Sequence, residues 1–492
     1  MCNRVAISSM DASSLISNKK HRNPHDREGK NESGIRICDL PDPILQLIIS
    51  SLPTKEAVRT SVLSKRWEYL WMGISKIKLR EGAPEKRQQF VDFVRRLLVD
   101  CDCSNLTKFS LSCKVGDGAS EVNEWLRGFI NPQIQELNLS FEGIEEPLVF
   151  PDHLFACATL TKFELSMQHI FKLPSSILFE SLRILSLVYI TFPDYSSTQR
   201  LFSGCPSLEE LSLVNCNWVN VESVCISSPV LQKLMITEWR EEDDDKFDED
   251  DDIGGQNVSN CCNVVIVGTN LKSFSYDGHF CNDYFLYSST SVINASIEVH
   301  ALDFSDEDWE SDVGYSVFKL LKALSNVERL SISEIALLAI DSTASLLGYL
   351  PLFCNLAELE VSGAASPIRL SCEAMLTILR NSPCLQVVHF HMGGVSLPKN
   401  CANNNHIMDP LPVCFKTNLK TIKIYCFSGS DDELNAIKFL LQEASVLDKI
   451  YIYCSSFEFD SPAESKRLKK LYKQIVRFPR ESMDCKIILK YF

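Results

Sequence analysis

Long apolar runs are missing from this 492-residue sequence, and none approaches the ~18 to 20 residues that a membrane-spanning helix needs. Residues 1–30 also lack the apolar core of a secretory signal peptide. We therefore expect a protein of the cytoplasm, the nucleus or both, without a membrane partner. The 20 cysteines are scattered, often within apolar segments, which is typical of free thiols in a reducing compartment rather than of a disulfide framework.

A basic stripe is also missing. The net charge is −15, and Glu241 to Asp252 alone contributes −9 of it through ten acidic residues and one lysine. Binding to nucleic acid needs clustered cations that neutralise phosphates, so we expect no nucleic-acid partner. Like charges at this density repel one another, and the acidic segment is predicted to be a solvated loop rather than a metal site.

Recognisable catalytic motifs are absent. The sequence contains no P-loop, dinucleotide-binding glycine signature or GxSxG elbow, and its cysteines lack the paired CxxC spacing of zinc sites. His389 and His391 alternate and would share one face of a strand, but no third ligand follows them at motif spacing. We expect no catalytic residues, metal or cofactor, which leaves a hydrolase or metal enzyme as the least supported class.

The sequence does contain a compact apolar stretch from Leu40 to Trp71. Its pattern predicts a helix capped by Asp42, with Pro43 in the first turn. Pro53 would end this helix and Thr54 would cap a second one. The first helix has almost no polar face. Because a unit of about forty residues rarely buries enough surface to be stable alone, these apolar side chains predict a partner.

The same stretch resembles an F-box of the plant type, which here includes Leu63-Ser64-Lys65-Arg66-Trp67. The resemblance implies docking to the adaptor subunit of an SCF-type cullin–RING ubiquitin ligase, and through it to a cullin. The expected adaptor contacts are the apolar positions of the pattern, Leu40, Pro41, Ile44, Leu45, Ile48, Leu52, Val58, Leu63 and Trp67. The alternative is a small helical cap that packs on the following domain.

Beyond residue 90 the dominant signal is an internal repeat of the form apolar-x-x-apolar-x-apolar. Most copies start roughly 22 to 34 residues apart, which is the range of leucine-rich repeats. The copies begin at Leu106, Ile134, Leu160, Leu182, Leu208, Leu231, Leu271, Val327, Leu356, Leu385, Leu419 and Leu447, with a degenerate copy near Ile297 and Val299. The long gap between Leu231 and Leu271 is attributed to the acidic insertion.

Each repeat contains an alternation of apolar and other residues, which marks a short strand with one buried face. No such strand covers its own apolar face, so neighbouring repeats must stack. The predicted fold class is therefore α/β: a leucine-rich-repeat solenoid with short parallel strands on its concave face, preceded by the small all-α F-box. A set of unrelated amphipathic strands is the competing interpretation, and it does not explain the regular spacing.

The residues after 411 resemble the FBD domain of plant F-box proteins, through Phe427-Ser428-Gly429, Ile437–Leu441 and Phe478-Pro479-Arg480. The pattern there predicts a helix over 433–441, a basic helix over 465–476 and a last strand over 487–489 that closes the solenoid. The expected domains are a disordered tail (1–34), the F-box (35–81), the solenoid (90–410, with the acidic loop at 238–256) and an α/β FBD-like module (411–492).

An F-box followed by a repeat array implies the substrate-recognition subunit of an SCF-type E3 ubiquitin ligase, whose catalysis belongs to other subunits. The alternative is a non-catalytic scaffold or regulatory binder that delivers no substrate. Candidate residues for binding a protein substrate are aromatic and basic side chains of the late repeats, His389, His391, Lys423, Tyr425, Lys449, Tyr451 and Tyr453. A helix of the C-terminal module could instead cover them.

Overall fold

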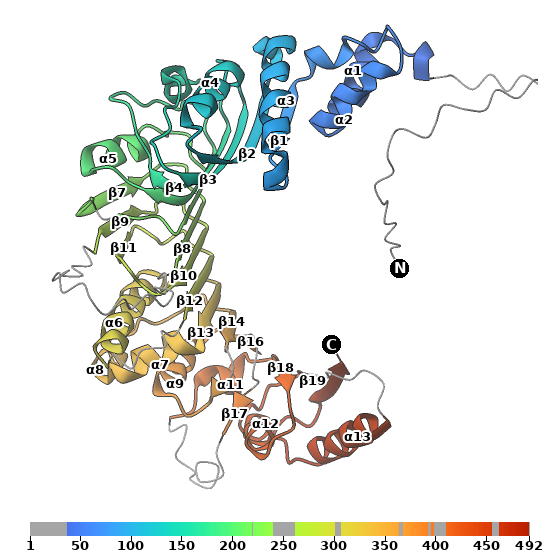
Figure 1. Ribbon diagram of the computed structural model, residues 1–492. Coiled ribbons are helices and arrows are strands. Elements are labelled where there is room, and N and C mark those ends of the chain that lie inside the picture. The colour runs from blue at the N-terminus through green and yellow to red at the C-terminus, as the bar shows by residue number, and fades with distance from the viewer. Residues whose placement is uncertain are drawn as a thin grey trace, which may run out of the picture.

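The computed structural model describes residues 37–218, 220–239, 261–300, 307–363, 368–391, 395–397, 410–454 and 462–491. One sheet of fifteen parallel strands runs through most of these residues and bends into an arc (Figure 1). The strands follow the inner side of the arc, and helices and irregular segments follow its outer side. This mixed α/β arrangement is consistent with the predicted leucine-rich-repeat solenoid.

Short helices form the N-terminal unit at one end of the arc (Figure 1). They are α1 (Asp42–Ser50), α2 (Thr54–Arg59) and 3-10 turns at Ile37–Asp39, Thr60–Val62 and Leu70–Gly73. The expected break at Pro53 separates α1 from α2.

The predicted N-cap roles of Asp42 and Thr54 are wrong. Pro41 and Pro53 occupy the two cap positions, and neither helix has a side-chain cap. Asp42 instead forms an ion pair with Arg66, and the Thr54 hydroxyl accepts a hydrogen bond of 2.7 Å from the Lys78 backbone N–H. The two polar side chains therefore connect their helices to later segments of the chain.

The large sheet takes one strand from every repeat copy that the sequence predicts. Its order is β1 (Lys76–Arg80), β2 (Lys108–Gly116), β3 (Glu136–Ile144), β4 (Lys162–Ile170), β5 (Ile184–Thr191), β6 (Glu210–Val214), β8 (Lys233–Glu238), β10 (Ser273–Gly278), β12 (Asn294–Val299), β13 (Arg329–Ser333), β14 (Glu358–Ser362), β16 (Val387–Phe390), β18 (Thr421–Phe427), β19 (Lys449–Cys454) and β20 (Lys486–Tyr491). The degenerate copy is β12, the strand expected over 487–489 is the edge strand β20, and β1 forms the other edge.

Alternate residues of each strand point into a core that is continuous along the arc. In β3, Leu137, Leu139 and Phe141 are buried, whereas the residues between them are partly or fully exposed. The register stacks equivalent positions, so that Leu137 lies between Phe109 of β2 and Phe163 of β4. Each repeat therefore covers the apolar face of its neighbours, which is the reason that the array is stable only as a stack.

The outer side of the arc differs along its length. Its helices are α3 (Arg87–Asp100), α4 (Ala119–Phe129), α5 (Tyr195–Ser203), α6 (Glu307–Ala323), α7 (Glu334–Ser342), α8 (Ala344–Leu347), α9 (Glu373–Arg380), α11 (Val413–Thr417), α12 (Asp431–Glu443) and α13 (Pro462–Val476). In the middle repeats, β7 (Ser223–Ser227), β9 (Asn263–Val267) and β11 (Asp283–Tyr287) form a second parallel sheet instead, and β15 (Ile368–Arg369) pairs with β17 (Val395–Ser396). The sequence pattern predicts only helical or irregular segments at these positions.

A buried carboxylate connects the two sheets at the end of β8. Glu238 is 5% exposed and accepts hydrogen bonds from the Tyr276 hydroxyl at 3.1 Å, the Asn282 amide at 2.7 Å and the Tyr284 hydroxyl. Burial raises the pKa of Glu238, although these donors act in the opposite direction. Gly278 is required beside it, because a Cβ there would lie 1.9 Å from the Glu238 carbonyl oxygen.

The C-terminal segment extends the same sheet with β18, β19 and β20. α12 begins with a capping box, in which Ser430 and Glu433 each accept a hydrogen bond from the other's backbone N–H. Glu433 is 1% exposed and also accepts from Ser428, so this helix start is fixed to the end of β18. The helices expected over 433–441 and 465–476 are confirmed as α12 and α13.

Two predicted features lie outside the residues that the structure describes. The disordered tail over 1–34 and residues 240–256 of the acidic loop lie outside the described residues. Among the residues that are described, no helix combines the length and apolar character needed to cross a bilayer.

Candidate functional site

Apolar side chains lie exposed on the N-terminal helices. Their exposed fractions are 45% for Ile44, 72% for Leu47, 39% for Leu52, 85% for Val62 and 64% for Leu63. We call these five residues the F-box face. Beneath them Leu45, Ile49, Ala57, Trp67, Leu70 and Trp71 form a buried core. The unit therefore has both a buried core, which is continuous with the core of the repeat strands, and an apolar surplus that nothing in the described chain covers.

Arg66 holds the segment after Leu63 against the start of α1. Its guanidinium lies 2.6 Å from the Asp42 carboxylate and donates a hydrogen bond to the Leu40 carbonyl oxygen. The exposed Leu63 is three residues before this connection, and the exposed Ile44 is two residues after Asp42. In the Lys65-Arg66-Trp67 motif, Arg66 thus holds the two segments that carry Ile44 and Leu63 together, while Trp67 packs in the core.

The structure separates the nine predicted adaptor contacts into three groups. Leu45 and Trp67 are 0% and 5% exposed, so these two assignments are corrected: the side chains belong to the core and offer no surface to a partner. Leu40, Ile48 and Val58 are partly buried, and Pro41, Ile44, Leu52 and Leu63 are exposed. Sequence reasoning missed Leu47 and Val62, although Leu47 lies one helical turn after Ile44 and so shares its side of α1.

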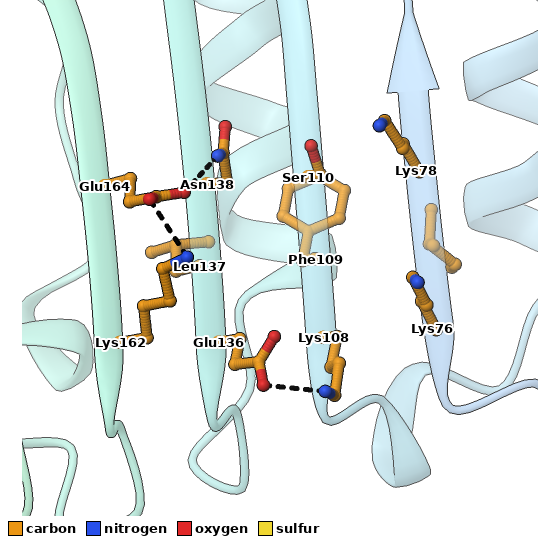
Figure 2. Close-up of a pocket in the computed structure, with 11 residues that line it drawn as sticks. Lys76, Lys78, Lys108, Phe109, Ser110, Glu136, Leu137, Asn138, Lys162 and Glu164 are labelled. Atoms are coloured by element: carbon orange, nitrogen blue, oxygen red, sulfur yellow. Dashed lines mark hydrogen bonds and ion pairs between the residues drawn. The ribbon is translucent and has the colours of Figure 1, made fainter. Parts of the chain in front are cut away.

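A shallow pocket of about 230 Å³ lies on the inner face near the N-terminal end of the sheet (Figure 2). Lys108 pairs with Glu136 at 2.6 Å, and Lys162 pairs with Glu164 at 3.0 Å; Asn138 also donates to Glu164. Lys76 and Lys78 of β1 line the same pocket. With four lysines and two glutamates the pocket is polar and positive, and it holds no nucleophile paired with a base.

The inner face near the C-terminal end is aromatic instead. The ring of His391 stacks on Tyr425 of β18 with centroids 4.2 Å apart, and Tyr425 stacks on Tyr453 of β19 at 4.5 Å. Lys490 of β20 lies 5.9 Å from the Tyr453 ring centroid and 5.4 Å from that of Tyr451. Stacked rings with a cation at one end form a preorganised surface that loses little conformational entropy on binding.

A second row of side chains lies beside this stack. The sheet register places Glu360, His389, Lys423 and Tyr451 next to one another on β14, β16, β18 and β19. His389 is 7% exposed. Burial and the neighbouring Lys423 lower the pKa of His389, although Glu358 and Glu360 act in the opposite direction. Its imidazole is therefore mainly neutral at neutral pH.

The structure thus brings six of the seven predicted substrate-binding residues together. The exception is Lys449, which is exposed at the start of β19, beside Thr421 and Lys486 rather than the rings. Sequence reasoning missed Glu358, Glu360 and Lys490, because only the order of the strands shows that they border the cluster. We call His389, His391, Lys423, Tyr425, Tyr451, Tyr453 and Lys490 the aromatic patch.

None of the described helices of the C-terminal module covers this patch. α13 packs on α12, on the helical side of the sheet (Figure 1). Leu471 of α13 lies against Gly429. Tyr425, Tyr451 and Tyr453 each remain partly exposed on the opposite side. The alternative in which a terminal helix hides these rings is therefore not what the described residues form.

Three known families match separate parts of the chain. The F-box domain family matches residues 37–78, the FBD family matches residues 409–452, and the LRR repeats of the family described as FBD-associated F-box protein At5g56370 match residues 122–250.

Relatives from Arabidopsis thaliana match nearly the whole chain. F-box/LRR-repeat protein At3g59200 is 28% identical over 89% of this chain and 86% of its own length. F-box/FBD/LRR-repeat protein At5g56420 is 26% identical over 92% of this chain and 98% of its own length. The chain thus matches F-box, leucine-rich-repeat and FBD family models in that order, and its relatives over nearly the whole length are Arabidopsis F-box/LRR-repeat and F-box/FBD/LRR-repeat proteins.

Proposed function

We propose that this chain is the substrate-recognition subunit of an SCF-type cullin–RING E3 ubiquitin ligase, acting in the cytoplasm, the nucleus or both. The observation that carries the proposal is the F-box face, which stays exposed although the residues beneath it are already buried. F-box/leucine-rich-repeat proteins are generally non-catalytic adaptors that bring substrates to such ligases, and an F-box implies binding to the adaptor subunit. In this role the chain holds a substrate near the subunits that transfer ubiquitin, which raises the effective concentration of the substrate there.

Adaptor binding is assigned to Ile44, Leu47, Leu52, Val62 and Leu63, with Pro41 at the edge. These side chains are mostly exposed and apolar, and burying one large apolar side chain contributes about 1.5–3 kcal/mol. The buried Leu45 and Trp67 act indirectly, because they shape the core on which the face rests. This assignment replaces the nine-residue set that the sequence pattern alone predicts.

Substrate binding is assigned to the aromatic patch. Tyrosines with neighbouring basic groups are enriched in the residues that dominate protein–protein binding energy. The stack from His391 through Tyr425 to Tyr453 is already ordered, so binding there requires little reorganisation. Lys423 and Lys490 favour a substrate segment that carries acidic side chains beside an apolar or aromatic one.

Co-purification tests the ligase role against the scaffold alternative. The full chain should co-purify at equal stoichiometry with a plant adaptor subunit and, when cullin is added, with the adaptor–cullin complex. Replacing Leu47 and Leu63 with aspartate should abolish this, because two charges would then be buried without partners. The matched control is Val99→Asp, which changes an 85% exposed apolar residue of α3 outside the F-box. If the unchanged chain binds no such adaptor, the ligase role is wrong.

A second experiment tests the aromatic patch. Replacing Tyr451 and Tyr453 with alanine should reduce capture of protein substrates by at least about tenfold while adaptor binding is kept. The control replaces Tyr287 and Tyr349, which are 55% and 73% exposed and lie outside the patch. If the folded Tyr451/Tyr453 variant captures substrates as well as the unchanged chain does, this assignment is wrong.

A further inference from the structure

We propose that Glu360, His389 and His391 form a binding site for a divalent transition-metal ion, with zinc as the best-matched element. One carboxylate oxygen and two imidazole nitrogens, the ligand atoms of the three residues, lie within 4.8 Å of one another. The proposal concerns the side chains of this chain alone and holds whether or not the chain serves a ubiquitin ligase.

Two neighbouring strands build the site. Glu360 on β14 is the register partner of His389 on β16, and His391 follows two residues later. Residues spaced by two on an extended strand project to the same side, and the two imidazole rings are parallel within 7° with centroids 5.8 Å apart. The third ligand that is missing near the histidines in the sequence is therefore supplied by the adjacent strand.

The two histidines have buried nitrogens without hydrogen-bond partners. His389 is 7% exposed, and the Nε2 atoms of both His389 and His391 are buried and make no hydrogen bond among the described residues. They lie 2.8 Å from Glu358 Oε1 and 3.2 Å from Glu360 Oε1 respectively, close enough for ion pairs but not aligned for an N–H to donate. Buried polar atoms are rarely left in this state, and coordination to a shared cation would satisfy both nitrogens.

The geometry is close to that of a tetrahedral zinc site. Zinc binds imidazole nitrogen and carboxylate oxygen at about 2.0–2.2 Å, which places the ligand atoms about 3.3 Å apart. The separation of 3.2 Å between Glu360 Oε1 and His391 Nε2 already matches, and the ligand atoms of all three residues, which lie within 4.8 Å of one another, would draw closer around an ion. A water can complete the four ligands.

Charge and donor type both decide which ion fits. Glu358 and Glu360 contribute two negative charges, while Lys423 faces His389 from β18 and Arg329 lies 3.3 Å from the second oxygen of Glu358. The site is thus nearly neutral overall, and it must attract a cation through its nitrogens. Two imidazoles with few oxygens select zinc, copper, nickel or cobalt over magnesium and calcium, which require oxygen ligands.

Metal binding would also affect the aromatic patch. His391 stacks on Tyr425, so fixing its imidazole fixes one end of the ring stack. An ion with one coordination position open to exchange would add a ligand site for an acidic or histidine side chain next to the tyrosines.

Titration of the metal-free full chain with zinc sulfate tests the proposal, with affinity measured by competition against a chromophoric chelator. We expect one equivalent to bind with a Kd of about 10 μM or tighter, within the range of specific binding. Glu360→Gln and His391→Gln should each weaken this binding by at least about 100-fold. His300→Gln is the matched control, because His300 pairs with Asp277 at 2.7 Å but lies outside the cluster.

Cobalt(II) provides a second readout that separates this site from the cysteines. The absorption should show tetrahedral cobalt without a thiolate charge-transfer band, and Glu360→Gln and His391→Gln should remove the signal. Both variants should keep the melting temperature of the metal-free chain, since Glu360 and His391 are only partly buried. Zinc affinity that is unchanged in folded Glu360→Gln and His391→Gln variants, or a cobalt spectrum with thiolate character, would overturn the proposal.

Discussion

Leu45 and Leu47 are two residues apart on α1, yet the structure assigns them opposite roles. Leu45 is fully buried, whereas Leu47 is 72% exposed. Burying a whole leucine side chain contributes about 1.5–3 kcal/mol, so covering the exposed part of Leu47 contributes about 1–2 kcal/mol. Leu63 is 64% exposed and should contribute a similar amount. The double variant Leu47→Ala/Leu63→Ala should therefore lose about 2–4 kcal/mol of adaptor binding, or about 30- to 1,000-fold in Kd.

Leu45→Ala should behave in the reverse way. Removing a fully buried leucine leaves a cavity and typically lowers the free energy of unfolding by about 2–5 kcal/mol. Since Leu45 offers no surface to a partner, the folded fraction of this variant should bind the adaptor within about threefold of the unchanged chain.

Calorimetric titration with a purified adaptor subunit, combined with thermal unfolding of each variant, measures both effects. The Val99→Asp variant of α3 serves as the control for surface changes outside the F-box. The reasoning is refuted if the stably folded Leu47→Ala/Leu63→Ala protein binds with unchanged affinity. A Leu45→Ala protein that stays as stable as the unchanged chain but loses the adaptor would refute it equally.

Three further predictions concern the repeat array. Because burial raises the pKa of Glu238, the folded state holds a proton that the unfolded state releases. The free energy of unfolding should therefore fall as pH rises from the usual glutamate pKa toward the raised one, by up to about 1.4 kcal/mol per pH unit. Urea unfolding between pH 5 and 8 should show that Glu238→Gln removes this pH dependence, whereas the exposed control Glu145→Gln keeps it. Leu211→Ala in β6 should lower the free energy of unfolding by about 2–5 kcal/mol in urea titrations, whereas Ser212→Ala should be nearly neutral. Among the cysteines that the structure describes, iodoacetamide at pH 8 should modify mainly the exposed ones, which peptide mass spectrometry should identify as Cys261, Cys354, Cys384 and Cys426. Burial raises the pKa of Cys113, Cys205 and Cys414 to about 12, so rapid labelling of these three would contradict the described core.

The repeat strands were predictable because their pattern is local. A buried residue two positions after another, as in Leu137 and Leu139, defines a half-buried strand without knowledge of its neighbours. A strand that must cover an apolar face then requires the next one, and parallel stacking follows. Even the weakly patterned Ile297 could be placed, because the spacing of the other copies predicted a strand there.

The outer side of the arc was not predictable in the same way. Val264 and Ile266 of β9 alternate as clearly as the inner strands, but nothing local distinguishes an inner strand from an outer one. The F-box caps failed for a related reason. Thr54 is a good N-cap by type, and only the approach of β1 makes the Lys78 N–H its partner instead.

In the candidate sites, too, local sequence pattern did not show which residues become neighbours in the fold. Leu45 and Leu47 are equally apolar and both lie in α1, so their type could not separate core from surface. Glu360 lies a whole repeat before His389, and the strand register alone places the two side by side. Residue types nevertheless predicted the aromatic character of the late repeats, because alternate positions of each strand must face the inner side of the arc.

We propose that assembly and substrate recognition occupy two separate surfaces of one chain. Proximity labelling in plant cells under proteasome inhibition tests it, with the unchanged chain compared against the Leu47→Asp/Leu63→Asp and Tyr451→Ala/Tyr453→Ala variants. The first variant should lose the adaptor and cullin but still label the substrates, and it should not promote their ubiquitination. The second variant should keep the adaptor and cullin and lose those same substrates. If the two variants lose the same set of proteins, or if the unchanged chain labels no adaptor, the claim is contradicted.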